Sequence, residues 1–199
     1  MDRREFLSMG LAPLLLPTFA EAAPSASRPM SRAGRSGMLP NVPLITHNNK
    51  PVRFYDDLVR DKIVLINFFL LQCTDGRCPI AMYNLRKVQD LLGSRMGRDV
   101  FFITITLQPL FDRPDKLKAY ADDIVGVKPG WDFLTGKPAD VEFLRRSLGF
   151  ADSDPQRDQD LTNHTRSARY GNDKLERWGM VSLRSSPMNI ASSFKWLTV

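Results

Sequence analysis

The stretch that decides the fold is residues 62–79, in which the apolar run KIVLINFFLL (62–71) leads into CTDGRCP (73–79). An almost unbroken apolar and β-branched run of this length is typical of a strand buried on both faces, as in the middle of an α/β sheet. Pro79 suits the first turn of a helix, where its missing N–H has no intrahelical partner. Apolar residues then recur close to helical spacing, at Ile80, Tyr83, Leu85, Val88, Leu91 and Leu92. We therefore predict a buried strand that passes through a cysteine-bearing turn into a helix.

This turn contains the only two cysteines of the chain, Cys73 and Cys78. Cys78 is predicted to lie at or just before a helix N-terminus, where unpaired backbone N–H groups and the helix dipole favour the thiolate. The thiolate is the form that attacks disulfides and binds soft metals. A domain of this size does not need one disulfide in order to fold. We therefore interpret the pair as chemically active, with a structural disulfide that pins the turn as the alternative.

Composition and charge indicate how many domains to expect and which classes of partner are compatible with the surface. The 199 residues, of which 43% are hydrophobic, suffice for one core, so a single domain is expected. The net charge is +6, but basic residues are mixed with acidic ones and form no stripe with interleaved aromatics, which argues against nucleic-acid binding. A mildly basic surface is compatible with a membrane surface or an acidic partner, and also with ordinary solvation.

The first 22 residues have the pattern of an export signal. The pair Arg3-Arg4 precedes an apolar stretch at residues 9–20, and residues 20–22 (AEA) match a cleavage site. The arginine pair resembles a twin-arginine signal, with a general secretory signal or an amphipathic helix as the alternatives. We predict a signal at residues 1–22, a linker rich in Pro and Ser at residues 23–38, and one domain at residues 39–199. The domain is then expected in the periplasm, where cysteine pairs persist as disulfides.

From residue 39 onward, strand and helix patterns alternate. A hairpin is predicted around residues 42–46 and 52–54 with Asn48-Asn49 at its turn. The further elements are a helical turn at 56–59, strands at 62–71, 100–107 and 131–134, helices at 79–95, 114–125 and 138–148, a polar loop at 151–160, a second hairpin at 162–170 and 175–183 with its turn at Gly171-Asn172, and a last helix at 186–197 capped by Ser186. This alternation predicts an α/β fold whose sheet contains parallel strands and carries helices on both faces.

The layout resembles the Sco/SenC family, thioredoxin-fold proteins that help to assemble the copper site of cytochrome c oxidase. The resemblance extends from about Leu39 to Leu197. It is carried by residues 64–69, Cys78-Pro79, residues 109–114, 117–121 and 130–136, and Asn163-His164-Thr165. It implies a thioredoxin-like α/β fold, with a central mixed sheet flanked by helices and an extra N-terminal β-hairpin.

The resemblance also implies a copper site. In the family, two cysteines spaced Cys-x3-Cys and one distant histidine bind copper, and by position these ligands are Cys73, Cys78 and His164. Two thiolates suit Cu(I), and the imidazole is available to Cu(II). The chain departs from the family pattern in two places. Its spacing is Cys-x4-Cys, and the loop that begins Asp-Pro in the family begins Gln108-Pro109 here, which removes a carboxylate. We therefore expect a divergent member.

Three classes of function follow. The resemblance implies an exported metallochaperone that receives copper from a donor and passes it to a protein such as an oxidase subunit. The alternative is a thiol-disulfide oxidoreductase, in which Cys73 and Cys78 are a catalytic redox pair that acts on a partner's cysteines without metal and is restored by a thiol reductant. The third is a binding module with a static disulfide. A peroxidase is disfavoured, because neither cysteine has the required setting.

Two methionines and the second histidine of the chain are weighed beside these ligands. The thioether sulfurs of Met82 and Met180 could contact Cu(I), but we expect both methionines to fill the core. His47 lies in the first hairpin turn and is expected to be exposed and without a role.

Overall fold

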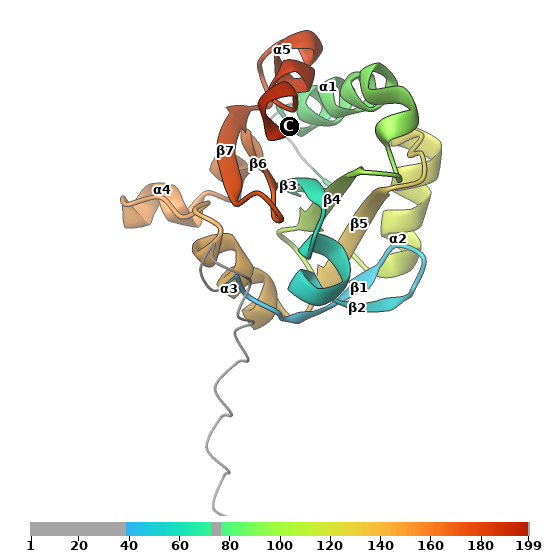
Figure 1. Ribbon diagram of the computed structural model, residues 1–199. Coiled ribbons are helices and arrows are strands. Elements are labelled where there is room, and N and C mark those ends of the chain that lie inside the picture. The colour runs from blue at the N-terminus through green and yellow to red at the C-terminus, as the bar shows by residue number, and fades with distance from the viewer. Residues whose placement is uncertain (1–38, 73–76, 199) are drawn as a thin grey trace, which may run out of the picture.

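The computed structural model describes residues 39–72 and 77–198 of the chain. Strand β3 (Ile63–Phe69) is buried along its entire length and lies inside a seven-stranded sheet of order β2-β1-β5-β4-β3-β6-β7 (Figure 1). The other strands are β1 (Pro43–Thr46), β2 (Pro51–Arg53), β4 (Val100–Thr106), β5 (Trp131–Gly136), β6 (Ser167–Asn172) and β7 (Arg177–Ser182). Strands β3, β4 and β5 are mutually parallel, whereas β1-β2 and β6-β7 are antiparallel additions at the two sides.

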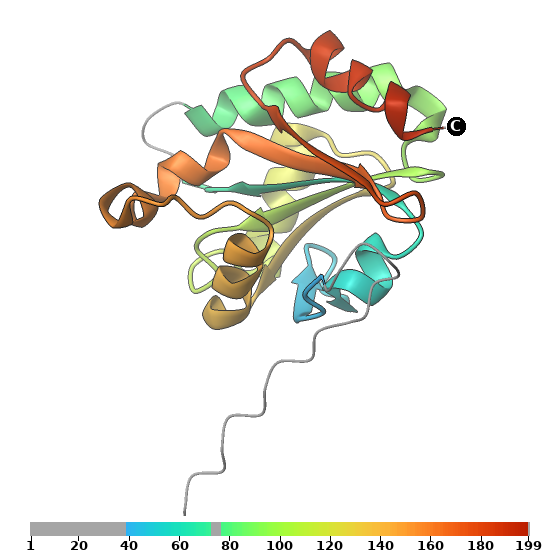
Figure 2. The same cartoon turned by 60° about the vertical axis from the view of Figure 1, so that its left-hand side comes forward.

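Helices cover both faces of the sheet because side chains alternate along β3. Leu65 and Phe69 join one core, and Ile66 and Phe68 join the other. The first face carries α1 (Arg77–Leu92), α2 (Pro114–Ala119), the π-helix η3 (Tyr120–Val125), α5 (Pro187–Ser192) and η5 (Lys195–Leu197). The second carries η1 (Phe54–Val59) and α3 (Pro138–Ser147), and Figure 2 shows α1 and α5 on the opposite side of the sheet from these two. The remaining elements are η2 (Gly93–Arg95), α4 (Pro155–Gln159) and η4 (Leu161–Thr165).

The structure confirms the predicted α/β class, the mixed sheet and the N-terminal hairpin. The hairpin turns at Asn49, whose φ of 58° suits asparagine. The last helix is shorter than predicted, but Ser186 does cap it, because its Oγ accepts a hydrogen bond from the N–H of Asn189 (3.2 Å). These elements could be predicted because their signals are local.

The predicted turn of the late hairpin was wrong. Strand β6 continues through Gly171 and Asn172, and the chain turns at residues 173–176, where Glu176 has a φ of 56°. Gly171 is required within the strand because a Cβ there would lie 2.3 Å from Cε3 of Trp178 on β7. The glycine therefore makes room for an indole ring and does not mark the turn.

The segment before β6 also differs from its prediction. Residues 161–165 form the 3-10 turn η4, because the carboxylate of Asp160 accepts a hydrogen bond from the N–H of Thr162 (3.0 Å). The predicted loop at residues 151–160 contains the short helix α4, capped in the same way by Asp154. Short capped turns therefore replace a loop and the beginning of a predicted strand.

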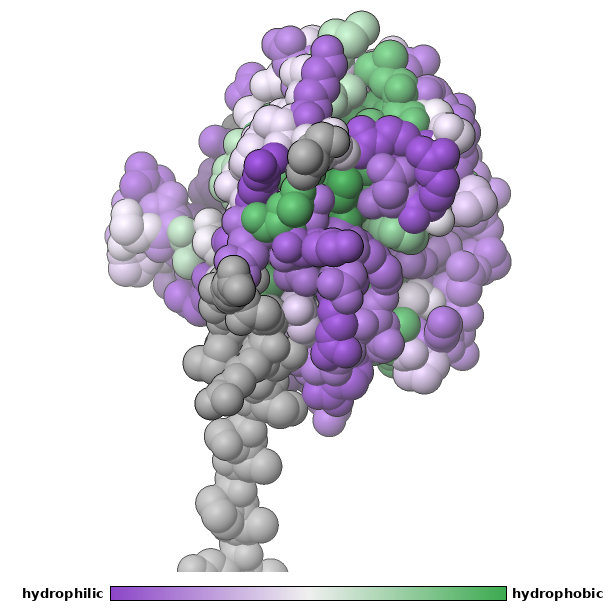
Figure 3. All heavy atoms as spheres, viewed as in Figure 1, coloured by the Kyte–Doolittle hydropathy of each residue, from purple (hydrophilic) through white to green (hydrophobic). Residues whose placement is uncertain are grey.

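The surface seen in Figure 3 is largely hydrophilic, with apolar side chains gathered over α1. In the described part of the chain, none of the helices has the length and apolar character needed to span a bilayer.

A buried chain of hydrogen bonds links the three parallel strands. Thr104 on β4 donates its hydroxyl to Oδ1 of Asn67 on β3 (2.8 Å). The same Oγ1 accepts a hydrogen bond from Nε1 of Trp131 on β5 (2.9 Å). All three side chains are buried in the sheet. One hydroxyl therefore satisfies two polar groups that have no access to water.

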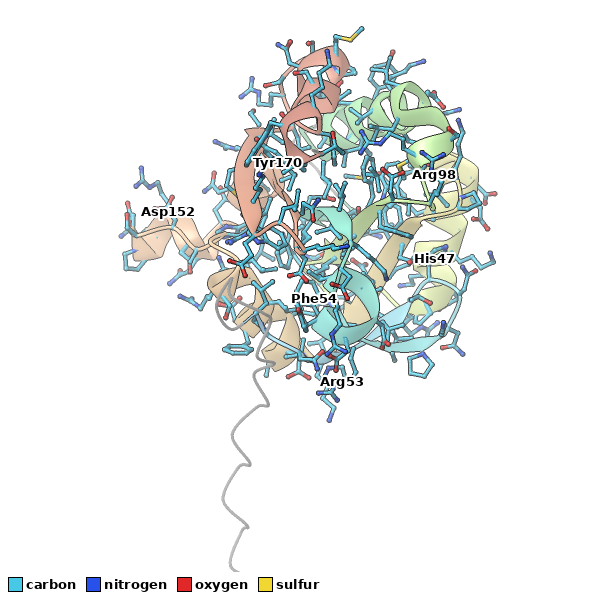
Figure 4. The ribbon with its side chains drawn as sticks, viewed as in Figure 1. His47, Arg53, Phe54, Arg98, Asp152 and Tyr170 are labelled. Atoms are coloured by element: carbon cyan, nitrogen blue, oxygen red, sulfur yellow. The ribbon has the colours of Figure 1, made fainter. Side chains whose placement is uncertain are left out.

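The expectation that His47 is exposed was wrong, since only 5% of this residue is exposed. The end of β1 pairs with β5, and this pairing brings the hairpin turn over Phe133, whose N–H donates to Nδ1 of His47 (3.2 Å; Figure 4). The side-chain amide nitrogen of Asn48 lies 3.1 Å from Nε2. Burial lowers the pKa of His47, although the nearby carboxylate of Asp132 opposes this shift. The imidazole is therefore held in its neutral form by its surroundings.

We predict that Thr104→Val destabilises the protein although it preserves the shape of the side chain. The substitution leaves Oδ1 of Asn67 and Nε1 of Trp131 without their partner, and each orphaned buried group costs about 1–3 kcal/mol. Urea unfolding should therefore show a loss of about 2 kcal/mol or more in the free energy of unfolding.

Thr135→Val is the matched control, because Oγ1 of Thr135 is also buried but has no hydrogen-bond partner among the described residues. Removing this hydroxyl should change the free energy of unfolding by less than about 0.5 kcal/mol, or raise it. Equal losses in the two variants would contradict the role assigned to Thr104.

The lowered pKa of His47 predicts that stability falls in mildly acidic solution. The unfolded chain, with an imidazole pKa near 6.5, binds a proton more readily than the folded chain. The stability that His47 contributes is therefore present above that pH and is lost as the pH falls toward the folded pKa. In His47→Asn the side-chain oxygen replaces Nδ1 but does not titrate. The unfolding free energy of this variant should fall less steeply between about pH 7.5 and pH 5.5; parallel curves would refute the assignment.

Candidate metal centre

The predicted copper ligands begin where β3 ends. Cys73 lies outside the described residues. Cys78 is the second residue of α1, so its backbone occupies the first turn of the helix, as predicted; its side chain lies outside the description. Pro79 follows in the same turn. The dipole of α1 is therefore directed so that it favours a negative charge at the turn that carries Cys78.

The topology brings the segment of His164 to the same edge of the sheet. Strand β6 runs antiparallel to β3, with Ala168 opposite Asn67, so the residues before β6 lie beyond the carboxyl end of β3. The 3-10 turn η4, which carries His164, contacts both β3 and α1. Figure 2 shows this segment beside the beginning of α1. Chain segments that are distant in sequence therefore meet where the cysteine-bearing turn starts.

The imidazole of His164 is buried and is bonded within the protein. Nε2 lies 2.9 Å from the backbone oxygen of Asp158, and a carbonyl oxygen only accepts, so Nε2 carries the hydrogen and donates it. Nη1 of Arg145 lies 3.4 Å from Nδ1 and 3.2 Å from Nε2. In the described structure, therefore, both ring nitrogens face protein groups and not an open site.

Arg145, which contacts this imidazole, is itself part of a buried ion pair. Its Nη1 and Nη2 donate to the two carboxylate oxygens of Asp158 at 2.6 and 2.8 Å. Its Nε and Nη2 also donate to Glu142, at 2.8 Å each, and its Nη1 donates to the carbonyl of Phe150 (3.1 Å). Only 3% of the Arg145 side chain and 8% of the Asp158 side chain is exposed. A bidentate pair of this kind fixes both direction and distance.

Asp158 has two further donors. The N–H of Asp152, on the projecting segment seen in Figure 4, donates to Oδ1 (2.8 Å), and Arg146 donates to Oδ2 from the solvent side (2.8 Å). The hydrogen bonds from Arg145, followed by that from Asp152, hold the pKa of the Asp158 carboxyl well below its usual range. Asp158 and Glu142 in turn raise the pKa of Arg145. The pair therefore stays charged, and it ties α3 to α4.

Arg145 and Asp158 were not predicted from the sequence as members of the site. A signal for Arg145 was present, because it lies four residues after Val141 and one residue after Leu144, on the apolar stripe of the helix predicted at 138–148. A cation on a buried stripe indicates a buried counter-charge. Which carboxylate fills that role depends on how the following loop folds back.

A second buried carboxyl lies near the cysteine-bearing turn. Asp112 accepts hydrogen bonds from the hydroxyl of Thr106 and the N–H of Leu71, two residues before Cys73. Burial raises the pKa of Asp112 despite these bonds. Gln108, at the position where the family has an aspartate, uses its backbone N–H to bond Oγ1 of Thr106 (3.0 Å). This end of β3 therefore retains a carboxyl group, from Asp112.

The two methionines have different positions. Met82 is buried in the core under α1, as predicted. Met180 lies on the edge strand β7 and is 48% exposed, so the prediction that it fills the core was wrong. The sheet places β7 at its border, where one side of the strand faces solvent.

The predicted donor set suits copper by its chemistry, since thiolates and imidazole are the ligands that copper prefers. Within the described residues, no group of three or more His, Cys, Asp or Glu side chains is arranged to hold a metal ion. The topology thus supports a site shared by α1 and η4, but the imidazole is held by Arg145 and Asp158 in this arrangement.

Comparison with known proteins identifies the family. The SCO1/SenC family model matches residues 39–198. The structure is similar to that of a SCO1/SenC family lipoprotein from Bacillus anthracis str. Ames, which is 21% identical, with a TM-score of 0.66 over 81% of this chain and 95% of that one. It is also similar to Bradyrhizobium japonicum ScoI with copper bound (26% identical, TM-score 0.61, 79% and 98% covered).

A third similar structure is BsSco, described as a Sco family cytochrome c oxidase assembly protein with a disulfide switch (21% identical, TM-score 0.63, 79% and 91% covered). The comparison with curated proteins gave no match. The family model covers most of the chain, including η4 and the whole of α1. The chain therefore belongs to the SCO1/SenC family.

Proposed function

We propose that this chain is an exported copper metallochaperone that holds copper through Cys73, Cys78 and His164 and delivers it to a copper site such as that of cytochrome c oxidase. The observation that carries the proposal is the contact of η4 with β3 and α1, the two elements that flank Cys73 in the sequence. The copper bound to ScoI and the description of BsSco as an oxidase assembly protein support the same function.

Residues from different elements of the chain would bind the copper ion together. Copper is the cargo, and two thiolates bind Cu(I) with the softness that this ion prefers. The N-terminus of α1 favours the thiolate of Cys78, so that the ligand is deprotonated when copper arrives. His164 would add the third ligand from a separate element, η4. A site built from two elements can be opened by moving one of them, as delivery to an acceptor requires.

We further propose that residues 1–22 are a twin-arginine-type export signal, residues 23–38 a linker, and residues 39–199 the copper-binding domain in the periplasm. Residues 1–38 lie outside the described part of the chain. The description of the Bacillus anthracis relative as a lipoprotein supports a role outside the cytoplasm. The partners would then be a copper-receiving protein such as an oxidase subunit, together with a copper donor or a thiol reductant.

A thiol-disulfide oxidoreductase is the second candidate. It is favoured by the disulfide switch described for BsSco, which indicates that a cysteine pair in this fold can change its redox state. In this chain the pair would be Cys73 and Cys78, acting on the cysteines of a partner without metal.

We predict that the reduced chain binds one equivalent of Cu(I) in competition with a chromophoric chelator such as bicinchoninate. Cys73→Ser/Cys78→Ser should abolish this binding, because the soft ligands are lost. His164→Ala should weaken it by at least about tenfold, since even indirect partners of metal ligands change affinity by about 10–100-fold. The control is His47→Asn, which changes the other histidine of the chain and should leave copper affinity unaltered.

Absence of stoichiometric Cu(I) binding by the wild-type chain would contradict the copper proposal. If the same preparation formed and broke a Cys73–Cys78 disulfide readily with a thiol buffer, the oxidoreductase would replace the chaperone. Equal weakening by His47→Asn and His164→Ala would remove His164 from the ligand set.

A further inference from the structure

We propose that the Arg145–Asp158 ion pair is a latch that holds His164 in a buried, copper-free position, so that release of this imidazole sets the copper affinity of the chain. The copper part of this inference rests on the proposed function, in which His164 is a ligand. The latch itself rests on the contacts of the described residues.

Neither ring nitrogen of His164 is free in the described structure. Nε2 donates its hydrogen to the carbonyl of Asp158 at 2.9 Å, so it has no lone pair to offer in this arrangement. Nδ1 has Nη1 of Arg145 at 3.4 Å. A copper ion bound at Nδ1 would lie about 2 Å from it, as metals do from imidazole nitrogen, and therefore close to a positively charged guanidinium. Copper can use His164 only after the ring has moved.

The groups that hold the ring are themselves fixed by contacts from several elements. Arg145 extends from α3 and is anchored by Glu142 on the same helix and by the carbonyl of Phe150. Asp158 lies in α4 and is fixed by Arg145 and by the N–H of Asp152. The carbonyl that accepts from His164 belongs to Asp158 itself. The ion pair thus positions both the donor and the acceptor that face the imidazole.

His164 can leave its buried position without breaking the ion pair. Release costs the ring its hydrogen bond to the carbonyl of Asp158 and its contact with Nη1 of Arg145, whereas Arg145 and Asp158 remain joined by their two bonds at 2.6 and 2.8 Å. The ring is carried by η4, a 3-10 turn of five residues between α4 and β6. Release therefore needs a change in a short turn, and the latch stays formed to receive the ring again.

These features define two states of the chain, one with His164 held and one with it released. Only the released state offers all three copper ligands. The apparent dissociation constant is then the intrinsic one divided by the fraction of released chains. Any change that loosens the latch should increase this fraction and strengthen copper binding by the same factor.

The experiment compares Arg145→Lys with the matched control Arg146→Lys. Arg145→Lys keeps the charge but removes the planar fork that reaches His164. Arg146→Lys makes the same change in the neighbouring arginine, which bonds Asp158 and Glu142 from the exposed side and, within the described structure, makes no hydrogen bond with the ring. Asp158→Asn is a second latch variant. It replaces Arg145→Lys in both measurements if near-ultraviolet circular dichroism shows that Arg145→Lys does not fold.

The first measurement needs no metal. Diethyl pyrocarbonate modifies accessible imidazoles, and mass spectrometry distinguishes His164 from His47, which serves as the internal reference. We expect slow modification of His164 in the wild type and in Arg146→Lys, and modification at least roughly tenfold faster in the latch variants, with the rate at His47 unchanged. Unchanged modification of His164 in folded latch variants would refute the latch.

The second measurement is Cu(I) affinity for the same proteins. We expect copper binding to strengthen by the same factor as modification accelerates. Faster modification with weaker copper binding would overturn the proposal, because the ion pair would then orient His164 for copper. Faster modification when the wild type binds no copper at all would leave the latch standing and refute the proposed function instead.

Discussion

Burial of β3 on both faces determines where every other part of the candidate site can lie. A strand covered on both sides must be flanked by strands and by two helical layers, and its side chains alternate between two cores. Its carboxyl end then becomes the place where the chain passes into α1. Antiparallel pairing of β6 with the same strand brings the preceding turn, η4, to that end. The proximity of the cysteine and histidine segments is thus a consequence of the sheet.

The buried ion pair adds a second constraint at this edge. Arg145 and Asp158 are almost entirely buried, and a buried charge is tolerated only when it is paired and hydrogen-bonded. Replacing such a pair by apolar residues often costs little stability, so its presence beside a predicted ligand calls for a functional reason. Holding the imidazole of His164 supplies one. Under the proposed function the chain must both bind and release copper, and a competing protein site for one ligand would limit how tightly the metal is held.

The sequence predicted those features whose signals are local. The apolar run of β3, the proline at the start of α1 and the asparagine turn of the first hairpin all act through neighbouring residues. The predictions failed where a distant contact decides the outcome. His47 is buried only because β1 pairs with β5, and Gly171 lies inside a strand because the ring of Trp178 on β7 needs the space.

At the candidate site, too, the features with local signals could be predicted and those that depend on distant contacts could not. The helix position of Cys78 followed from periodicity and Pro79, whereas the assignment of His164 as a ligand came from the family resemblance. The position of Arg145 on an apolar stripe was visible in the sequence, but its partner Asp158 became apparent only from the folded loop. Buried charge pairs of this kind are formed by residues whose spacing carries no periodic signal.

Copper K-edge X-ray absorption spectroscopy of the Cu(I)-loaded chain tests the central claim most directly, because it reports the atoms bonded to the metal. Ligation by Cys73, Cys78 and His164 predicts sulfur scatterers together with the multiple-scattering pattern of one imidazole, and predicts that this pattern disappears in His164→Ala. A spectrum without sulfur, or an imidazole pattern that persists in His164→Ala, would contradict the account.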